Sequence, residues 1–426
     1  MADFDSGKDL ARAGHALDTI NFFLADVRDG LGPYLAIYLL TEQKWDEASI
    51  GVVMSLATIA GIVAQTPAGA LVDATRAKRL VMISAAIVVT AASLLLPLMT
   101  SFWPVAISQS IANAAGVIFA PAIAAVPLGI VGAKAFTARV GRNETFNHAG
   151  NTVGAVIAGA AAYALGPSAV FYLMAVTSAG SLISVLAIPE RAIDHDVARG
   201  LAHQAEGNRP KRGEQPSGLS ILLTCRPLLI FAVCVALFHL ANAAMLPLVG
   251  QKLALQDKNL DTSLMSACIA AAQLVMVPMA LLVGARADRW GHKRFFLAAL
   301  LILPLRAVLY TLSDDKAWLV GVQLLDGVGA GIFGAIMPVI VADLMRGTGR
   351  FNIAQGAVIT AQSIGAALST ALAGLVVVHS GYNAAFLVLG AAAALAVIVC
   401  WLLLPETGGA EAAHPNAAPS PAIPAE

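Results

Sequence analysis

Charged residues are scarce in this chain of 426 residues. Asp, Glu, Lys and Arg make up 12% of it and hydrophobic residues 58%, whereas a soluble globular protein carries about 25% charge. The formal net charge is zero, so no overall basic surface indicates a nucleic-acid partner. The four cysteines, Cys225, Cys234, Cys268 and Cys400, have no metal-binding or redox spacing. We therefore expect a polytopic membrane protein without a metal site or a cofactor.

The motifs of several function classes are also missing. The sequence contains no Gly-x-x-x-x-Gly-Lys-Ser/Thr loop that would cradle ATP phosphates. It shows no nucleophile–base cluster of the kind that a membrane enzyme needs, and its polar N-terminus lacks a signal-peptide pattern. These absences predict that the protein is not an enzyme.

Long apolar runs are abundant, and twelve of them are long enough to cross a hydrocarbon core of about 30 Å. A polar stretch at 191–218 divides them into two groups of six. We expect an all-α membrane protein in which residues 1–190 and 219–405 form two six-helix bundles. The stretch 191–218 is then a cytoplasmic central loop, and 406–426 is a disordered cytoplasmic tail. The twelve predicted spans are 19–41, 48–72, 80–100, 103–131, 144–165, 168–189, 227–251, 262–284, 295–313, 317–343, 353–378 and 382–404.

The distribution of Lys and Arg predicts the orientation. If both termini are cytoplasmic, 20 of the 26 basic residues lie on the cytoplasmic side and four on the outer side, with Arg28 and Arg306 inside spans. Such a bias is typical of multi-pass proteins whose basic loops stay in the cytoplasm. We expect a monomer in a bacterial inner membrane, with membrane lipids around it.

The two groups of spans are copies of one unit. "GALVDATRAKR" (69–79) follows the second span, and "GARADRWGHKR" (284–294) follows the eighth. Gln109 and Gln323 also correspond, 214 residues apart. A repeat of half the chain predicts two pseudo-symmetric bundles. The matching motif positions are Gly69 and Gly284, Asp73 and Asp288, and Arg79 and Arg294.

On these motifs the chain resembles the major facilitator superfamily over nearly its full length. The family's loop signature is G-x-L-x-D-x-x-G-x-[RK]-x-[RK]. In this chain Arg286 stands at the Leu position of the second copy, and Arg76 stands where a Gly is usual in the first. The resemblance implies transport of a small solute by alternating access. It also implies that Asp73 and Asp288 hold a cytoplasmic gate shut, by accepting hydrogen bonds from a helix N-terminus in the other half. The alternative for the basic residues is that they only set topology.

Charges inside the predicted spans indicate a transport pathway. Asp26, Arg28 and Asp29 lie in the first span, where each charge costs roughly 2.5–3.5 kcal/mol on insertion scales. Asp26 and Asp29 share one helix face. One hypothesis is that this triplet faces a central cavity and binds solute or a proton. The alternative is a structural patch that neutralises itself.

A second charge pair is predicted from the depth at which two charged residues lie in their spans. Arg306 in the ninth span and Asp326 in the tenth lie at equal depth, about 12 Å below the outer surface. The sequence "LPLRAVLYTL" (303–312) is similar to the ninth span of lactose-permease-like members. An ion pair that breaks when Asp326 takes a proton is a plausible coupling device, and a static buried pair is the alternative.

The fifth predicted span carries Glu144, His148 and Asn151 at one-turn spacing. His148 can titrate near neutrality, and Glu144 is expected near the cytoplasmic end as a gate residue; ordinary packing is the alternative. The fourth-span Arg of many proton-coupled members is absent, since Ala106 stands there. We expect a proton-coupled secondary transporter rather than a drug exchanger, with an uncoupled facilitator and a transporter-like sensor as alternatives.

Overall fold

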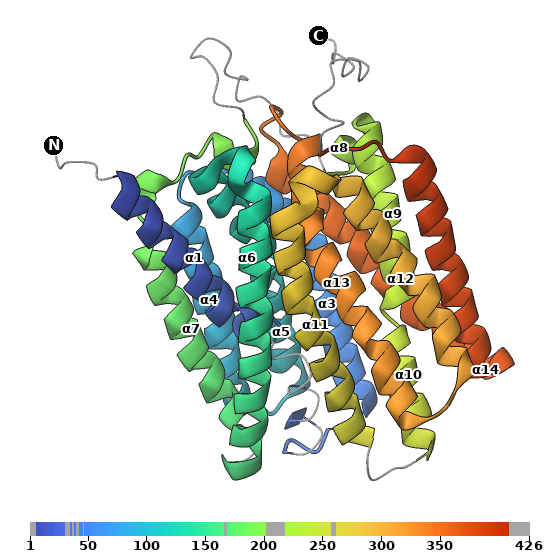
Figure 1. The fold of residues 1–426 in the computed structure, drawn as a ribbon. Helices are drawn as coiled ribbons and strands as arrows, with labels where there is room; N and C mark the ends of the chain where they lie inside the picture. Colours follow the sequence, from blue (N-terminus) through green and yellow to red (C-terminus); the bar gives the residue numbers. More distant parts are fainter. Residues whose placement is uncertain are drawn as a thin grey trace.

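The computed structural model describes residues 6–29, 35, 38–39, 42–45, 47–165, 168–201, 218–256 and 261–408. Within these ranges the chain is a bundle of helices without a strand (Figure 1). The long helices are α1 (Ser6–Asp29), α3 (Glu47–Ala74), α4 (Lys78–Leu95), α5 (Phe102–Gly116), α6 (Phe119–Leu165), α7 (Ala169–Ala187), α9 (Arg226–Asn242), α10 (Met245–Gln256), α11 (Asp261–Trp290), α12 (His292–Leu312), α13 (Lys316–Leu344) and α14 (Phe351–Leu403). The short ones are α8 (Gly218–Thr224) and the 3₁₀ helices η1 (Leu96–Leu98), η2 (Glu190–Ala192) and η3 (Val197–Arg199).

Among the described residues, nine stretches of helix are long and apolar enough to cross a membrane. Two of the nine are too long for one crossing: 53 residues of α14 would extend about 80 Å if straight. The backbone of α14 leaves the helical region at Gly381 (φ +82°), and that of α6 leaves it at Gly132 (φ +70°). Glycine takes these angles without strain, so the chain turns back at both points. With both turns counted, the nine described stretches therefore give eleven candidate crossings.

Two boundaries differ from the predicted ones. The fifth span begins after Gly132 and not at residue 144, because the polar stretch 134–143 is helical. Within this stretch Arg139 is buried and pairs with Asp18 inside the bundle. The first helix begins at Ser6, thirteen residues before the predicted span. The backbone of α1 includes Asp26, Arg28 and Asp29, but their side chains lie outside the described residues.

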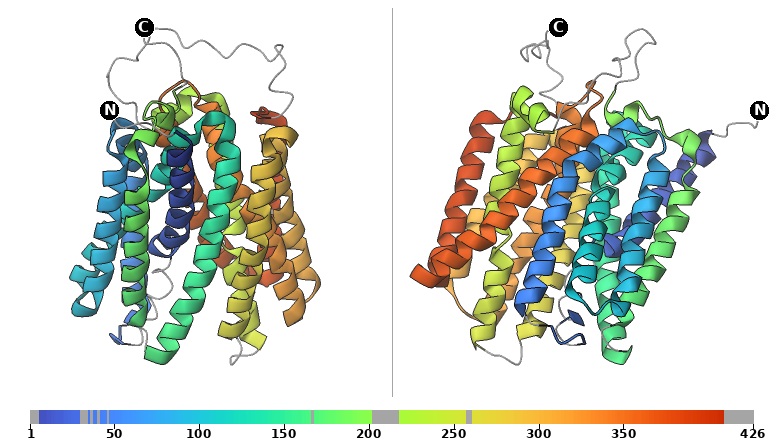
Figure 2. Two further views of the ribbon diagram at one scale, coloured as in Figure 1. Left: turned by 60° about the vertical axis from the view of Figure 1, so that its left-hand side comes forward. Right: turned by 180° about the vertical axis from the view of Figure 1, so that it is seen from behind.

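The helices form two halves that stand side by side. Helices α1–α7 form the first half and α9–α14 the second, and α1 begins at the same end of the bundle where α14 ends (Figure 1). We call this end the terminal side. Between the halves, α3 packs on α14 and α6 packs along α11; Figure 2, seen from behind, shows α3 beside the first part of α14.

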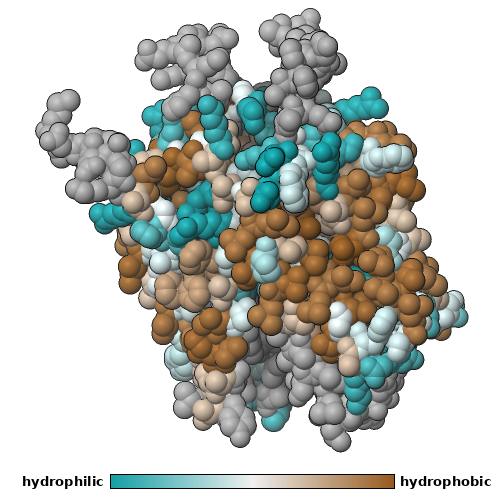
Figure 3. All heavy atoms as spheres, viewed as in Figure 1, coloured by the Kyte–Doolittle hydropathy of each residue, from teal (hydrophilic) through white to brown (hydrophobic). Residues whose placement is uncertain are grey.

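Apolar side chains cover much of the outside. In Figure 3 a broad hydrophobic area lies below a more hydrophilic terminal side. Large side chains such as Val63, Tyr172 and Val378 are at least two-thirds exposed. A monomeric soluble protein does not expose so much contiguous apolar surface, so this surface faces lipid.

Glycines bring the two halves into direct backbone contact. A Cβ atom added to Gly356 would lie 2.7 Å from the carbonyl oxygen of Gln65, and one added to Gly141 would lie 2.6 Å from the Cα atom of Gly284. One added to Gly69 would collide with the carbonyl oxygen of Asn352. Small residues permit this approach, and the contacts lie toward the terminal side.

Candidate functional site

Asp73, at the end of α3, caps the first turn of α14 in the other half. Its carboxylate accepts hydrogen bonds from the backbone N–H of Ile353 (2.8 Å) and of Asn352 (3.2 Å). The side-chain amide of Asn352 donates a third bond of 2.7 Å. Asp73 is buried, and a carboxylate at a helix N-terminus is favoured by the helix dipole. The contact predicted for this motif residue is therefore present.

The second copy of the motif is built differently. Asp288 lies 3.0 Å from Nε2 of His292, and Nδ1 of His292 lies 2.7 Å from the carboxylate of Asp343. The hydrogen bond that the structure describes for Asp288 therefore lies within the second half, whereas Asp73 binds the backbone of a helix N-terminus in the other half. Sequence reasoning missed His292, whose only signal was its place within the repeated motif at 284–294.

The remaining motif residues lie on the terminal side. Arg79 donates a 3.0 Å hydrogen bond to the carbonyl oxygen of Leu186, and its guanidinium lies 3.9 Å from the Glu190 carboxylate. Arg294 is exposed on the first turn of α12. Gly284 packs against Gly141. Of the contacts described for these motif residues, those of Gly69, Gly284 and Asp73 join the two halves.

The segment 190–201, expected to be part of a loop, is folded against both halves. The N–H of Asp194 donates to the Gly129 carbonyl oxygen in the first half (2.9 Å). In the second half, the Asn352 amide donates to the Ala198 carbonyl oxygen (3.1 Å). Burial, and then the nearby charges of Lys78 and Arg76, lower the pKa of His195 in this segment. A neutral imidazole at pH 7 suits such a position.

The predicted pair of Arg306 and Asp326 is confirmed. Nη1 of Arg306 lies 2.6 Å from Oδ1 of Asp326, and Arg306 is only 1% exposed. Nη1 also donates to Oδ1 of Asn242 (2.6 Å), and Nη2 donates to Oε1 of Gln323 (3.2 Å). The second oxygen of Asp326 accepts from Nε2 of Gln323 (3.0 Å). Tyr310 completes the network through its hydroxyl, which donates to Oε1 of Gln323 (2.5 Å).

The polar residues on α6 contribute a link between the halves. Nδ1 of His148 lies 3.0 Å from Oε1 of Gln273 on α11. Nε2 of His148 lies 3.9 Å from the Glu144 carboxylate, and Asn151 lies half-buried one turn further along the helix. Because this span begins after Gly132, Glu144 lies about 16 Å inside the bundle. It is therefore not near the helix end, where we expected it.

A buried ion cluster joins α1 to α6, and sequence reasoning missed it. Asp18 accepts hydrogen bonds from Arg139 and, at 2.6 Å, from Arg142. Arg139 also donates to Oδ1 of Asn143 (2.7 Å). In the sequence both arginines count among the 20 basic residues that predict the orientation. Their positions on a helix, one turn apart, were the signal that could have paired them with one carboxylate.

The comparisons with known proteins agree with this architecture. The profile of the Major Facilitator Superfamily matches residues 17–303 and 231–425. A protein of Mycobacterium tuberculosis, described in two strains as an uncharacterized MFS-type transporter, is 53% identical over 396 residues, covering 93% of this chain and 94% of that protein. The chain belongs to the major facilitator superfamily. It is accordingly a multi-pass membrane transporter of solutes.

Solved structures share the fold at low sequence identity. The proton:xylose symporter XylE, bound to 6-bromo-6-deoxy-D-glucose, superposes with a TM-score of 0.69 at 14% identity, covering 95% of this chain and 97% of that one. The transporter FucP in the outward conformation gives 0.68 at 14% identity, covering 91% and 97%. The human organic anion transporter MFSD10 gives 0.62 at 16% identity, covering 92% and 98%. These likenesses establish the fold alone.

Proposed function

We propose that the protein is a proton-coupled secondary active transporter that moves its solute by alternating access. The observation that carries the proposal is the Arg306–Asp326 ion pair, buried inside the membrane-spanning part of the second half. Charges in such a position are costly and mark ion or substrate pathways. The terminal side is proposed to be the cytoplasmic side of a bacterial inner membrane, in keeping with the distribution of Lys and Arg.

The contacts between the halves support a state that is closed on the terminal side. Besides the Asp73 contact, the hydroxyls of Thr66 and Thr360 lie 3.3 Å apart, and the rings of Phe136 and Phe351 meet edge-on at 6.1 Å. Alternating access requires that such contacts break when the halves rock. The aspartates and glycines of the motif are proposed to form this gate.

The geometry around Arg306 supports a coupling role for Asp326. A proton on Asp326 removes the charge that balances Arg306, while Asn242 and Gln323 still accept hydrogen bonds from the guanidinium. The arginine can therefore stay in place while its strongest partner changes charge. A switch of this kind links proton uptake to a change in packing between α12 and α13.

The solved neighbours support transport and leave the solute open. XylE is a proton:xylose symporter and FucP a fucose:proton symporter, whereas MFSD10 is an organic anion transporter. Proton coupling in this chain follows the first two by analogy. Glu144, His148 and the triplet Asp26, Arg28 and Asp29 are proposed to line the pathway.

The test is a solute screen with purified protein in sealed vesicles, with and without an imposed pH gradient. We expect at least one solute to accumulate above its equilibrium level only when the gradient is present. Flux that equilibrates solute at the same rate with and without the gradient would identify an uncoupled facilitator. No flux of any solute would contradict the transport cycle proposed here.

A further inference from the structure

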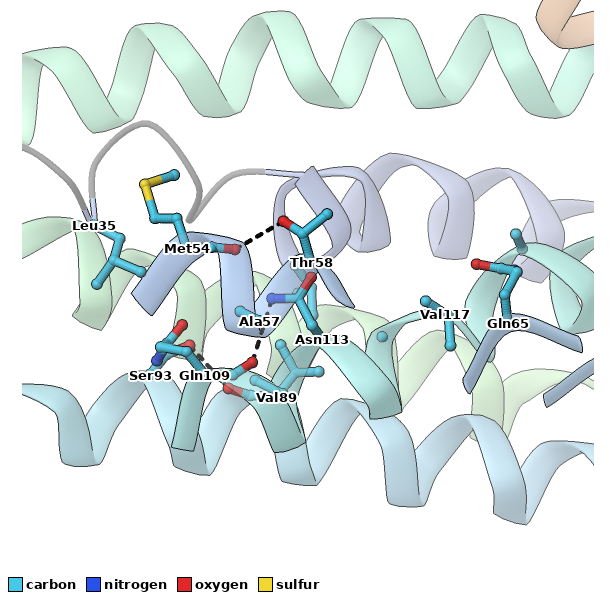
Figure 4. Close-up of a pocket in the computed structure, with 14 residues that line it drawn as sticks. Leu35, Met54, Ala57, Thr58, Gln65, Val89, Ser93, Gln109, Asn113 and Val117 are labelled. Carbon is cyan, nitrogen blue, oxygen red and sulfur yellow. Dashed lines mark hydrogen bonds between the residues drawn. The ribbon is translucent and has the colours of Figure 1, made fainter. Parts of the chain in front are cut away.

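A cavity of about 470 Å³ lies inside the first half, a volume typical of small-molecule sites. All fourteen described residues that line it belong to the first half. The lining is mostly apolar, and no described lining residue is charged. Its polar side chains are Thr58, Gln65, Ser93, Gln109 and Asn113 (Figure 4).

The corresponding part of the second half shows which side chains the first half lacks around this cavity. Helices α4 and α12 begin at residues 78 and 292, and α5 and α13 at 102 and 316, so an offset of 214 relates both pairs. This offset places Ala92 at the position of Arg306, and Ala112 at that of Asp326. The second half thus fills its interior with an ion pair, whereas the first half has two buried alanines there. Of the two alanines, Ala112 lines the cavity, so the carboxylate that is absent there leaves part of this volume.

The same comparison identifies a missing hydrogen-bond acceptor. Gln323 donates from Nε2 to Asp326, and its counterpart in the first half is Gln109. Because Ala112 replaces the carboxylate, Nε2 of Gln109 is buried without a hydrogen-bond partner in the described structure. Buried donors of this kind are rare unless a ligand or water completes them.

Among the other polar side chains of the lining there is a second hydrogen-bond donor without a partner. The hydroxyl of Thr58 donates to the Met54 carbonyl oxygen and that of Ser93 to the Val89 carbonyl oxygen, both at 2.8 Å. Nε2 of Gln65, by contrast, is also buried without a partner among the described residues. Figure 4 shows Gln65 well apart from the other polar side chains, beyond Val117. The two free amides are therefore well separated.

We propose that this cavity binds an uncharged solute that carries two hydroxyl or carbonyl oxygens, one for Gln109 and one for Gln65. The apolar lining covers the rest of the solute. A charged group would lose its hydration without meeting an opposite charge on the described lining, which is strongly unfavourable. This assignment rests on the proposed transport function and names the class of its solute.

The first test measures which reagents enter the cavity. A Thr58→Cys variant in lipid nanodiscs is treated with methyl and benzyl methanethiosulfonate, both neutral, and with the sulfonatoethyl and trimethylammonioethyl reagents, which are charged. Modification is followed by intact mass, with the parent protein and its native cysteines as the baseline. Both neutral reagents should react at least tenfold faster than either charged one. Equal rates, or no reaction with the neutral reagents, would overturn the assignment.

A second substitution tests the missing acceptor. In the Thr58→Cys background, Ala112→Asn places a carbonyl group where Asp326 stands in the second half. It should slow modification by the neutral reagents at least tenfold, and an unchanged rate would contradict the proposed geometry. If Thr58→Cys does not fold, Asn113→Cys serves as the reporter.

A transport assay then distinguishes a failure of the cavity assignment from a failure of the proposed transport function. For an uncharged solute found in the vesicle screen, Gln109→Leu should raise KM at least tenfold, while Gln43→Leu, a glutamine outside the cavity, leaves it unchanged. An unchanged KM in Gln109→Leu, or transport of charged solutes only, overturns the cavity assignment and leaves transport standing. If labelling is charge-selective but no solute is transported, the proposed transport function is refuted, whereas the assignment of the cavity is kept.

Discussion

Replacing Asp73 by Ala should open the terminal side. The Asp73 carboxylate accepts three hydrogen bonds from Asn352 and Ile353 at the first turn of α14. In the variant the two halves lose this contact, while the helix N–H groups become free to bind water once the halves part. The closed state is therefore weakened relative to the open one.

The magnitude follows from the three bonds and the burial. A hydrogen bond to a charged group contributes about 1.5–3 kcal/mol, so three of them contribute roughly 4–9 kcal/mol. The carboxylate is only 7% exposed, and removing it from water costs several kcal/mol. We take the net loss as about 2 kcal/mol, which corresponds to about a thirty-fold shift toward the open state.

The assay uses a Thr360→Cys reporter, because Thr360 lies within the closed contact opposite Thr66. A membrane-impermeant maleimide is added to inside-out vesicles, and its rate of reaction follows the open population. Asp73→Ala should raise this rate about thirty-fold, and Asp288→Ala less, because the hydrogen bond described for Asp288 lies within the second half. Glu190→Ala, at an exposed carboxylate on the same side, is the control and should change nothing. A rate that is the same in Asp73→Ala as in the parent would refute the gate.

Three further outcomes are expected. Asp326→Asn should abolish uphill accumulation in vesicles while equilibrium exchange of the same solute keeps at least half its rate; uphill transport at the parent level would reject the coupling role. Gly69→Ala should raise labelling of the Thr360→Cys reporter at least ten-fold, because its methyl group collides with Asn352, whereas Gly374→Ala, with open space around it, should not. Arg28→Lys should cut transport at least ten-fold by losing the planar fork while the protein still reaches the membrane, and normal transport by Arg28→Ala would show that this charge is structural.

Much of the architecture could be predicted, because a membrane imposes strong rules. Apolar runs of about twenty residues must span it, so the positions of most helices follow from hydropathy alone. Arg306 and Asp326 could be paired because a short connection joins their antiparallel helices, which makes depth a reliable guide. Asp73 could be placed because a repeated motif marked it.

The rest depends on contacts between distant segments. Asp18 meets Arg139 across 121 residues of sequence, and no local pattern links them. His292 lies between two carboxylates, of which only Asp288 stands nearby in the sequence. The cavity in the first half is lined by Ala112, which stands where the second half has Asp326, and an alanine in an apolar helix gives no signal until the two halves are superposed.

The glycine contacts between the halves also bear on how fast the protein can cycle. At Gly69, Gly141 and Gly356 the halves touch backbone to backbone, with no side chain of these residues inserted into the facing surface. Separation there needs no rotamer change, and it breaks only weak dispersion contacts. These glycine contacts therefore let the two halves separate easily, and they add little to the kinetic barrier of that separation. In the proposed cycle, the polar contacts around Asp73 would then decide how long the terminal side stays shut, and this one carboxylate would set the timing without altering the path of the movement.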